Sequence, residues 1–253
     1  QDSDSDVPFN KHILIIAGKN SKISYLERLE SRGGGSAKAT ANITVEVIAR
    51  SGAQVKFAAI DRLGENVTAY ISRRGKLGND ASIDWAIGVM NEGNVVADFD
   101  SDLIGNGSHA DLKAVALSSG RQVQGIDTRV TNYGCNSIGN ILQHGVILEK
   151  ATLTFNGIGH IIKGAKGADA QQESRVLMLS DQARSDANPI LLIDENDVTA
   201  GHAASIGQVD PEDMYYLMSR GLDKATAERL VVRGFLGSVI VEIPVKEVRD
   251  EMI

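Results

Sequence analysis

The chain has 253 residues, of which 42% are hydrophobic and 23% charged, the balance of a globular protein with a packed core. Its net charge of -7 and its few aromatic residues (4%) argue against a general nucleic-acid-binding protein, because phosphate binding needs a basic face. No stretch approaches the roughly 20 apolar residues of a membrane span. The single cysteine excludes a disulfide framework, and with no secretion signal visible we expect a cytoplasmic protein.

The first residues are acidic and polar, so we expect 1–7 to be disordered. An apolar run at 12–17 then predicts a buried strand. The glycines at 33–35 are typical of a turn. They do not form a phosphate-binding loop, because no Gly-Lys-Ser/Thr follows them.

From residue 41 onward the pattern predicts short strands separated by Gly, Asn and Asp. The predicted strands cover 43–48, 55–60, 67–71, 83–90, 112–117, 123–130 and 138–148. The absence of long helices between them argues against a doubly wound sheet, and leaves a sandwich of hairpins or a parallel β-helix. Small aliphatic residues suit the narrow interior of a β-helix, but no strict repeat period decides between the two.

After Gly207 the pattern becomes helical. Asp210 and Pro211 predict the start of one helix, and a second is expected from Asp223 to Gly234. A third apolar segment at 235–243 is cut by Pro244, and residues 245–253 could begin a last helix. Helices this short are marginal in water alone, so they must dock on the β body or on a partner. We therefore predict a β core over 8–208 and a helical region over 209–253.

One acidic triplet could carry chemistry. Asp98, Asp100 and Asp102 alternate, and a strand would place their carboxylates on one face, where they could serve as acid/base groups or bind a cation. Such a row is found in β-helix enzymes that act on acidic polysaccharides. The simpler interpretation is a solvated strand face, but a β-helix carbohydrate-active enzyme is kept as the alternative function.

Four other side chains are of a type that can act as a nucleophile or a metal ligand. Cys135 has no base beside it in sequence, and His144 and His160 have no second ligand at metal spacing, so we interpret all three as structural. His202 differs because Ala200, Gly201, Ala203 and Ala204 leave its ring unshielded. A neutral imidazole is a good iron ligand, which makes His202 the candidate for a metal site.

Several long stretches resemble one known family, and the densest similarity lies between 155 and 236. They are Phe155-Asn-Gly-Ile-Gly159, Gln172-Glu-Ser-Arg-Val-Leu-Met-Leu-Ser180, Ala187-Asn-Pro-Ile-Leu-Leu-Ile-Asp194, Asp197-Val-Thr-Ala-Gly-His-Ala-Ala-Ser205 and Tyr215-Tyr-Leu-Met-Ser-Arg-Gly221. On these residues the chain resembles the SufB/SufD family of the SufBCD iron–sulfur cluster assembly complex, and in particular the SufD proteins of Gram-positive bacteria.

Two differences, at Glu173/Ser174 and at Ala203, favour the SufD branch over SufB. SufB carries a cluster-binding cysteine in the strand where this chain has Glu173 and Ser174, and a Glu after the histidine where this chain has Ala203. Some SufD members have a cysteine at the position of Ala200. The resemblance therefore implies that any thiolate ligand comes from the partner.

The resemblance implies a right-handed parallel β-helix followed by a small helical region, without the helical N-terminal region of the family. It implies a scaffold subunit, not an enzyme, that pairs with SufB through β-helix edges and binds the ATPase SufC. The ATPase activity belongs to SufC. His202 would bind the cluster shared with SufB, while the isolated chain would hold no cofactor stably; a homodimer of the isolated chain is left open. The residues assigned to the ATPase contact are Tyr215, Tyr216, Leu217, Arg220, Gly221, Leu230, Arg233 and Phe235.

Overall fold

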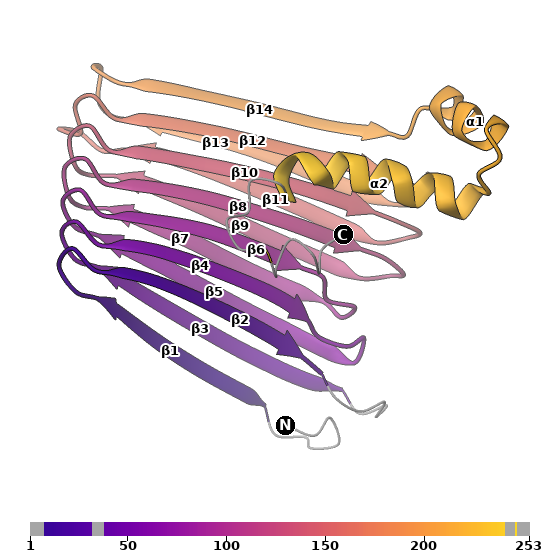
Figure 1. Ribbon diagram of the computed structural model, residues 1–253, viewed down its shortest axis with the longest axis horizontal. Helices are drawn as coiled ribbons and strands as arrows, with labels where there is room; N and C mark the ends of the chain where they lie inside the picture. The colour runs from indigo at the N-terminus through magenta and orange to yellow at the C-terminus, as the bar shows by residue number, and fades with distance from the viewer. Residues whose placement is uncertain (1–7, 32–37, 241–245, 247–253) are drawn as a thin grey trace.

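The computed structural model describes residues 8–31, 38–240 and 246. Within these ranges, fourteen strands form two parallel sheets of seven strands each (Figure 1). The odd-numbered sheet contains, in spatial order, β1 (Phe9–Ala17), β3 (Ala39–Ala49), β5 (Val67–Leu77), β7 (Val95–Leu103), β9 (Val123–Asn132), β11 (Thr152–Ile161) and β13 (Arg184–Ile193). The even-numbered sheet contains β2 (Lys22–Glu30), β4 (Gln54–Arg62), β6 (Ser82–Val89), β8 (His109–Ser118), β10 (Ile138–Ile147), β12 (Asp169–Met178) and β14 (Thr199–Gln208).

The chain alternates between the two sheets, so each turn contributes one strand to either side and pairs with the turn before it. This is a parallel β-helix, which confirms the predicted fold class and excludes a sandwich of hairpins. The register explains why the sequence shows no strict period. Ala69 pairs with Val95, 26 residues further on, whereas Phe9 pairs with Ala41, 32 residues further on. The loops take up the differences in turn length, so the strands keep their parallel register.

Side chains that point inward from the two sheets form one continuous apolar core. The largest of them are aromatic: Phe57, Trp85, Phe99 and Phe155 are each at most 1% exposed. The indole nitrogen of Trp85 donates to Ser101 Oγ at 3.0 Å, so its polar end is also satisfied. Burying a large apolar side chain completely is worth about 1.5–3 kcal/mol, and repetition over seven turns makes this core the main source of stability.

One loop column runs along the β-helix with a left-handed residue in each of the first six turns. Its members have φ values between 54° and 70°: Asn20, Gly52, Asp80, Gly107, Asn136 and Gly167. Their backbone N–H groups donate to the next turn, for example Asp80 N to Asn106 O at 2.9 Å. Glycine alternates with Asn or Asp because the side-chain oxygen of one turn occupies the space where a Cβ of the next would lie. For Gly107, that Cβ would lie 2.5 Å from Asp80 Oδ1.

We therefore predict that Gly107→Ala destabilises the protein by about 1–2 kcal/mol, because an L side chain in the left-handed region is strained and Asp80 must move. The matched control is Gly125→Ala, since no atom lies within 4 Å of its added Cβ. Urea unfolding followed by circular dichroism measures both. An equal loss of stability in the two variants would show that the column carries no special constraint.

The first turns bury a charged cluster inside the apolar core. Arg73 on β5 is fully buried, and its guanidinium donates to Asp61 on β4 at 2.7 and 2.8 Å and to Glu27 on β2 at 2.7 Å. It also lies over the Phe57 and Phe99 rings, 5.8 and 5.6 Å from their centroids. Burial alone would raise the pKa of Glu27, but Arg73 outweighs it and the pKa is lowered. The cluster therefore ties the two sheets together by charge as well as by packing.

Replacing Arg73 by Met should cost about 3–5 kcal/mol, because two buried carboxylates lose their counter-charge. The next residue offers the control. Arg74 points outward, is about half exposed and pairs with Asp98 at 3.2 Å, so Arg74→Met should cost less than about 1 kcal/mol. Denaturant midpoints of the two variants make the comparison; similar midpoints would mean that the buried cluster adds no stability.

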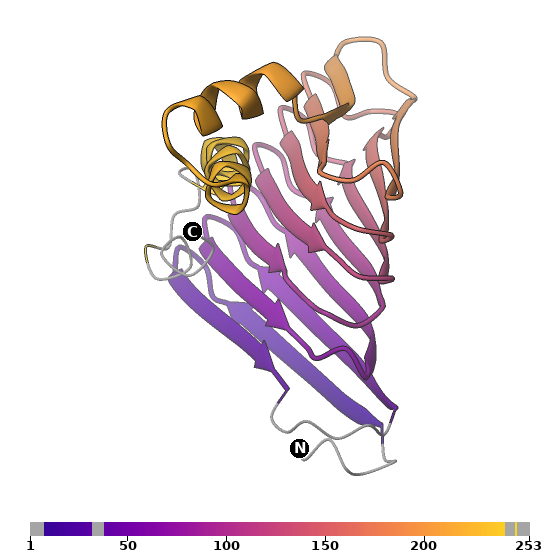
Figure 2. The same cartoon turned by 90° about the vertical axis from the view of Figure 1, so that its right-hand side faces the viewer.

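Two helices follow the last strand among the described residues. α1 (Pro211–Ser219) starts at the predicted position, with Asp210 Oδ1 accepting from Glu212 N at 2.8 Å. α2 (Lys224–Ile240) lies against the outer face of the even-numbered sheet, as the side view in Figure 2 shows. No helix in the described part of the chain is long and apolar enough to cross a membrane.

The predicted helix end at Gly234 is wrong, because α2 continues to Ile240. A glycine inside a helix costs about 1 kcal/mol relative to alanine. Leu236, Val239 and Ile240 bury their side chains against the sheet, which is worth about 1.5–3 kcal/mol each and outweighs that cost. Pro244, the expected start 1–7 and the last predicted helix lie outside the described residues, apart from residue 246.

Candidate functional site

The last turn of the β-helix ends in two open strand edges. β13 and β14 are terminal in their sheets, so within the described chain each has a paired strand on one side only. Apolar side chains accompany these edges, with exposed fractions of 39% for Ile190, 45% for Leu192 and 42% for Ile206. Unpaired edges with exposed apolar residues are prone to pair with another chain, so this end is a candidate interface.

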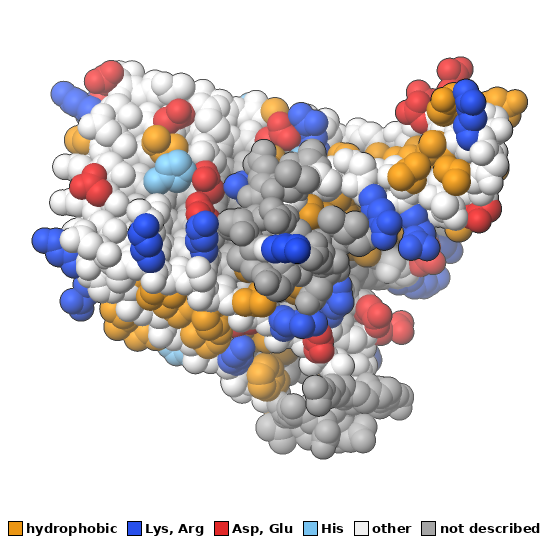
Figure 3. Space-filling model, in the orientation of Figure 1, with side chains coloured by type: hydrophobic (Ala, Val, Ile, Leu, Met, Phe, Trp, Pro, Cys, Tyr) orange, Lys and Arg blue, Asp and Glu red, His pale blue; other side chains and the backbone are white. Residues whose placement is uncertain are grey.

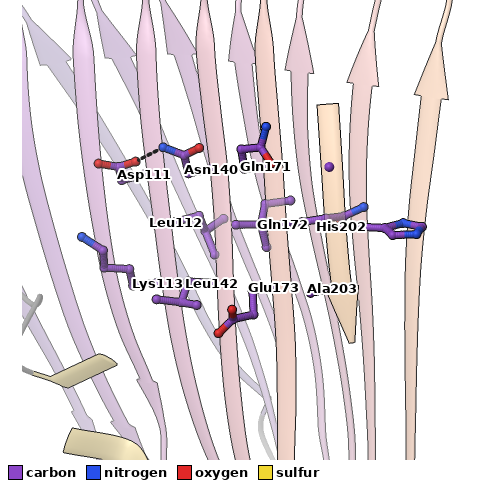
Figure 4. A pocket seen from close by; sticks show the side chains of 12 residues that line it. Asp111, Leu112, Lys113, Asn140, Leu142, Gln171, Gln172, Glu173, His202 and Ala203 are labelled. Carbon is purple, nitrogen blue, oxygen red and sulfur yellow. Dashed lines mark hydrogen bonds between the residues drawn. The ribbon is translucent and has the colours of Figure 1, made fainter. Parts of the chain in front are cut away.

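His202 lies on this open end. It is the fourth residue of β14, not in the loop before the helices, and it is exposed. Its Cα pairs with that of Gln172, which is only 5% exposed, so both side chains belong to the inner face of the even-numbered sheet. Figure 4 shows the His202 ring directed beyond β14, away from the other labelled side chains. The imidazole is thus available to a molecule that approaches along the axis of the β-helix.

The described residues nearby do not complete a metal site. No group of three or more His, Cys, Asp or Glu side chains in the described ranges is arranged to hold a metal ion. The neighbours of His202 along β14 are Gly201 and Ala203, and the paired positions on β12 carry Gln172 and Glu173. His202 can therefore supply one nitrogen ligand, and the remaining ligands must come from elsewhere.

A groove of about 600 Å³ lies beside His202 on the even-numbered sheet (Figure 4). Its lining includes Lys113, Leu142, Glu173 and Ala203 together with Asp111. The Asp111 carboxylate accepts from Asn140 Nδ2 at 2.8 Å and pairs with His109 Nε2 at 3.0 Å. Burial alone would raise the pKa of Asp111, but these two partners lower it, so the carboxylate is ionised at neutral pH. Charged, polar and apolar side chains all contribute to the lining of the groove.

The residues assigned to an ATPase contact lie on α1, α2 and their connection, and most are exposed. α1 buries none of its side chains, and Tyr215 and Tyr216 are 75% and 56% exposed. Arg220 lies over the Tyr216 ring, 5.1 Å from its centroid. Gly221 and Arg233 are also exposed, Leu230 is 50% exposed and Leu217 is half-buried. Figure 3 shows hydrophobic side chains gathered over the helices at this side of the molecule.

Phe235 is the exception in that set, because it faces the β-helix. It is half-buried and stacks on His144 of β10, with ring centroids 5.0 Å apart and an angle of 25° between the planes. The His144 side chain is 3% exposed, and its Nε2 lies 3.3 Å from Glu173 Oε1. Burial lowers the pKa of His144, although the hydrogen bond with Glu173 opposes this shift. Both side chains therefore belong to the packing of α2 on the sheet.

The acidic triplet shares the outer face of β7, as the alternation predicted. Asp98 and Asp100 lie 3.2 and 3.6 Å from the guanidinium of Arg74 on the neighbouring strand. Burial and the charge of Asp98 raise the pKa of Asp100 to about 6. The three carboxylates lie on the outer face of the odd-numbered sheet. His202 and the groove lie on the even-numbered sheet.

The two remaining candidates, Cys135 and His160, each contact an oxygen atom of the chain. Cys135 sits in the left-handed loop column, where its Sγ lies 3.4 Å from Gly164 O. His160 faces outward from β11 and its Nε2 lies 3.1 Å from Asp194 Oδ2. Sequence reasoning named Glu173 but missed the groove, because only the parallel register brings β8, β10 and β12 side by side.

Comparisons with known proteins agree with this architecture. Residues 1–235 match the family described as "SUF system FeS cluster assembly, SufBD core domain". The chain is 47% identical over 250 residues to "Iron-sulfur cluster assembly protein SufD" of Bacillus subtilis, covering 98% of this chain and 57% of that protein. It is 29% identical over 235 residues to a SufBD family protein of Mycobacterium leprae (92% of this chain, 27% of that one), and 24% identical over 233 residues to one of Staphylococcus epidermidis (92% and 50%).

The fold and its open end thus define a β-helical core with a candidate interface at its last turn. The chain belongs to the SufBD core-domain family of the SUF system of iron–sulfur cluster assembly, which confirms the resemblance found in the sequence. It spans little more than half the length of the SufD protein that it matches at 47% identity.

Proposed function

We propose that this chain is a scaffold subunit of iron–sulfur cluster assembly, without catalytic activity of its own. In this proposal it pairs with SufB through the edges of β13 and β14, and binds the SufC ATPase through α1 and α2. One observation carries it: an exposed histidine, His202, stands on an unpaired strand edge at the open end of the β-helix. We propose the cytoplasm as the compartment of the complex.

The edge is suited to another β-helix of the same kind. Strands β13 and β14 present backbone N–H and C=O groups that only a further strand or water can satisfy. A partner with the same two-strand turn could add to both sheets at once and cover Ile190 and Ile206. Main-chain hydrogen bonds would provide the register, and the apolar side chains would provide much of the affinity.

His202 then contributes one ligand to a site divided between two subunits. Neutral imidazole binds iron through one nitrogen, but a single nitrogen does not hold a cluster. The positions where a cysteine would be expected in this family carry Ala200, Glu173 and Ser174 instead. Thiolate ligands must therefore come from SufB, and the cluster is cargo that forms only in the complex.

The helices offer the second interface. A helix of nine residues with no buried side chain is unstable alone in water, so α1 gains most of its order from contacts outside itself. Tyr and Arg are over-represented among the residues that dominate binding energy, and Tyr215, Tyr216 and Arg220 lie exposed on or directly after α1. These contacts to SufC are proposed. The carbohydrate-active enzyme gains no support, because the family match and the accessible histidine both favour a scaffold.

We predict that His202→Ala leaves the fold and the heterodimer intact but sharply lowers cluster content in the co-expressed complex. The exposed ring leaves no core cavity when it is removed, so stability should change by less than about 0.5 kcal/mol. Iron and sulfide assays, visible absorbance and size-exclusion chromatography measure the three properties.

The control for this experiment is His12→Ala. His12 is also exposed and pairs with Glu46 at 2.8 Å, but it lies on β1 at the other end of the β-helix. Cluster content should not change in this variant. Equal content in the wild type and His202→Ala would remove His202 from the site.

A second prediction concerns α1. Tyr215→Ala should weaken SufC binding by roughly tenfold or more, because an exposed tyrosine at an interface centre often contributes over 1 kcal/mol. Tyr70→Ala is the matched control, since Tyr70 is 41% exposed on the outer face of the odd-numbered sheet, away from both helices. Calorimetric titration of SufC measures both. Unchanged binding in Tyr215→Ala would exclude α1 from the contact.

A further inference from the structure

In the part of the chain that the structure describes, α1 and α2 are held on the β-helix by one side of α2. α1 buries no side chain, so its position depends on the chain that follows it. α2 lies with its C-terminal half on the even-numbered sheet, where Leu236, Val239 and Ile240 pack around Val115 and Val146 (Figures 1 and 2). Aliphatic packing of this kind holds a helix down, but it fixes its rotation and its shift along the axis only loosely.

Phe235 and His144 add a contact with defined geometry at this place. The two rings stack at 5.0 Å with an angle of 25°, which allows little sliding of the helix before the contact is lost. The His144 ring is itself fixed from β12, because its Nε2 lies 3.3 Å from Glu173 Oε1. Glu173 is in turn held by Arg175 Nε at 2.9 Å. The stack therefore has a rigid base on the sheet.

The chemistry of His144 suits this role. Burial beneath α2 lowers its pKa, so the ring is neutral at pH 7 and presents an uncharged aromatic face to Phe235. At 3% exposure the side chain cannot touch a partner protein while α2 is in place. Any effect of His144 on partner binding must therefore pass through α2.

We propose that His144 is a positioning residue that fixes α2, and with it the exposed face carrying Tyr215, Leu230 and Arg233, on the β-helix. This inference rests on the proposed function for the identity of the partner, the SufC ATPase. The contact between His144 and Phe235 does not depend on that proposal. The inference also gives Phe235 a different role from its neighbours: Phe235 acts through His144 from beneath the helix instead of meeting the ATPase.

The test uses hydrogen–deuterium exchange of the whole chain, resolved by peptide. In His144→Ala the protection of amides in α2 should fall by about three- to tenfold, the equivalent of one aromatic contact, while strands far from α2 keep theirs. His144→Phe keeps the stack without the hydrogen bond and should retain most of the protection. The matched control is His160→Ala, which also removes a histidine paired with a carboxylate but lies on the other sheet.

Titration with the SufC ATPase then links position to function. SufC affinity should fall in His144→Ala by a factor similar to the loss of α2 protection, and should be unchanged in His160→Ala. Unchanged α2 protection in His144→Ala would overturn the inference, as would lost protection with full SufC affinity. If the wild-type chain fails to bind SufC, the proposed partner is wrong, and the exchange data still decide whether His144 positions α2.

Discussion

Parallel pairing of each turn with the next is the constraint on which the rest of this structure depends. In the described ranges, every strand between the first and the last turn has a neighbour on both sides, and the loop column also passes hydrogen bonds from turn to turn. Such a structure satisfies its backbone everywhere except at its two ends. The unsatisfied groups are thus concentrated on β1 and β2 at one end and on β13 and β14 at the other, and the candidate ligand His202 lies at the second end.

The interior shows how the two ends differ. Near the first turns, the inward row of residues contains Phe57, Trp85 and Leu112, all apolar and almost fully buried. The same row continues through Ile141 to Gln172 and ends at His202. Gln172 Nε2 donates to Ile190 O at 3.0 Å and so bridges the two sheets below the open end. The row that forms the core at one end therefore becomes a polar surface at the other, without any change of backbone geometry.

The sequence predicts the fold class well because its short strands and turn residues are local signals. Strands with strong apolar alternation, such as β4 and β10, were found directly. β2 was missed because Glu27 takes an inward position that only the distant Arg73 makes acceptable. β14 reads Thr-Ala-Gly-His-Ala-Ala-Ser-Ile-Gly-Gln, which has almost no apolar alternation, because an edge strand at an open end has little interior to fill. These two omissions come from contacts distant in sequence, and β11 and β12 also lie outside the predicted strands.

Some residues of the candidate site can be predicted from their neighbours in sequence, whereas others depend on residues far away in the chain. His202 could be found because its small neighbours are adjacent in sequence, and exposure followed from them. The contact between Phe235 and the sheet could not be found, because its partner His144 lies about ninety residues earlier and meets it only through the packing of α2 on β10. A residue's type and exposure on a helix indicate what it can bind, whereas its function as an anchor depends on the surface beneath. In this protein, the regular register of β8, β10 and β12 therefore also provides the surface on which α2 packs.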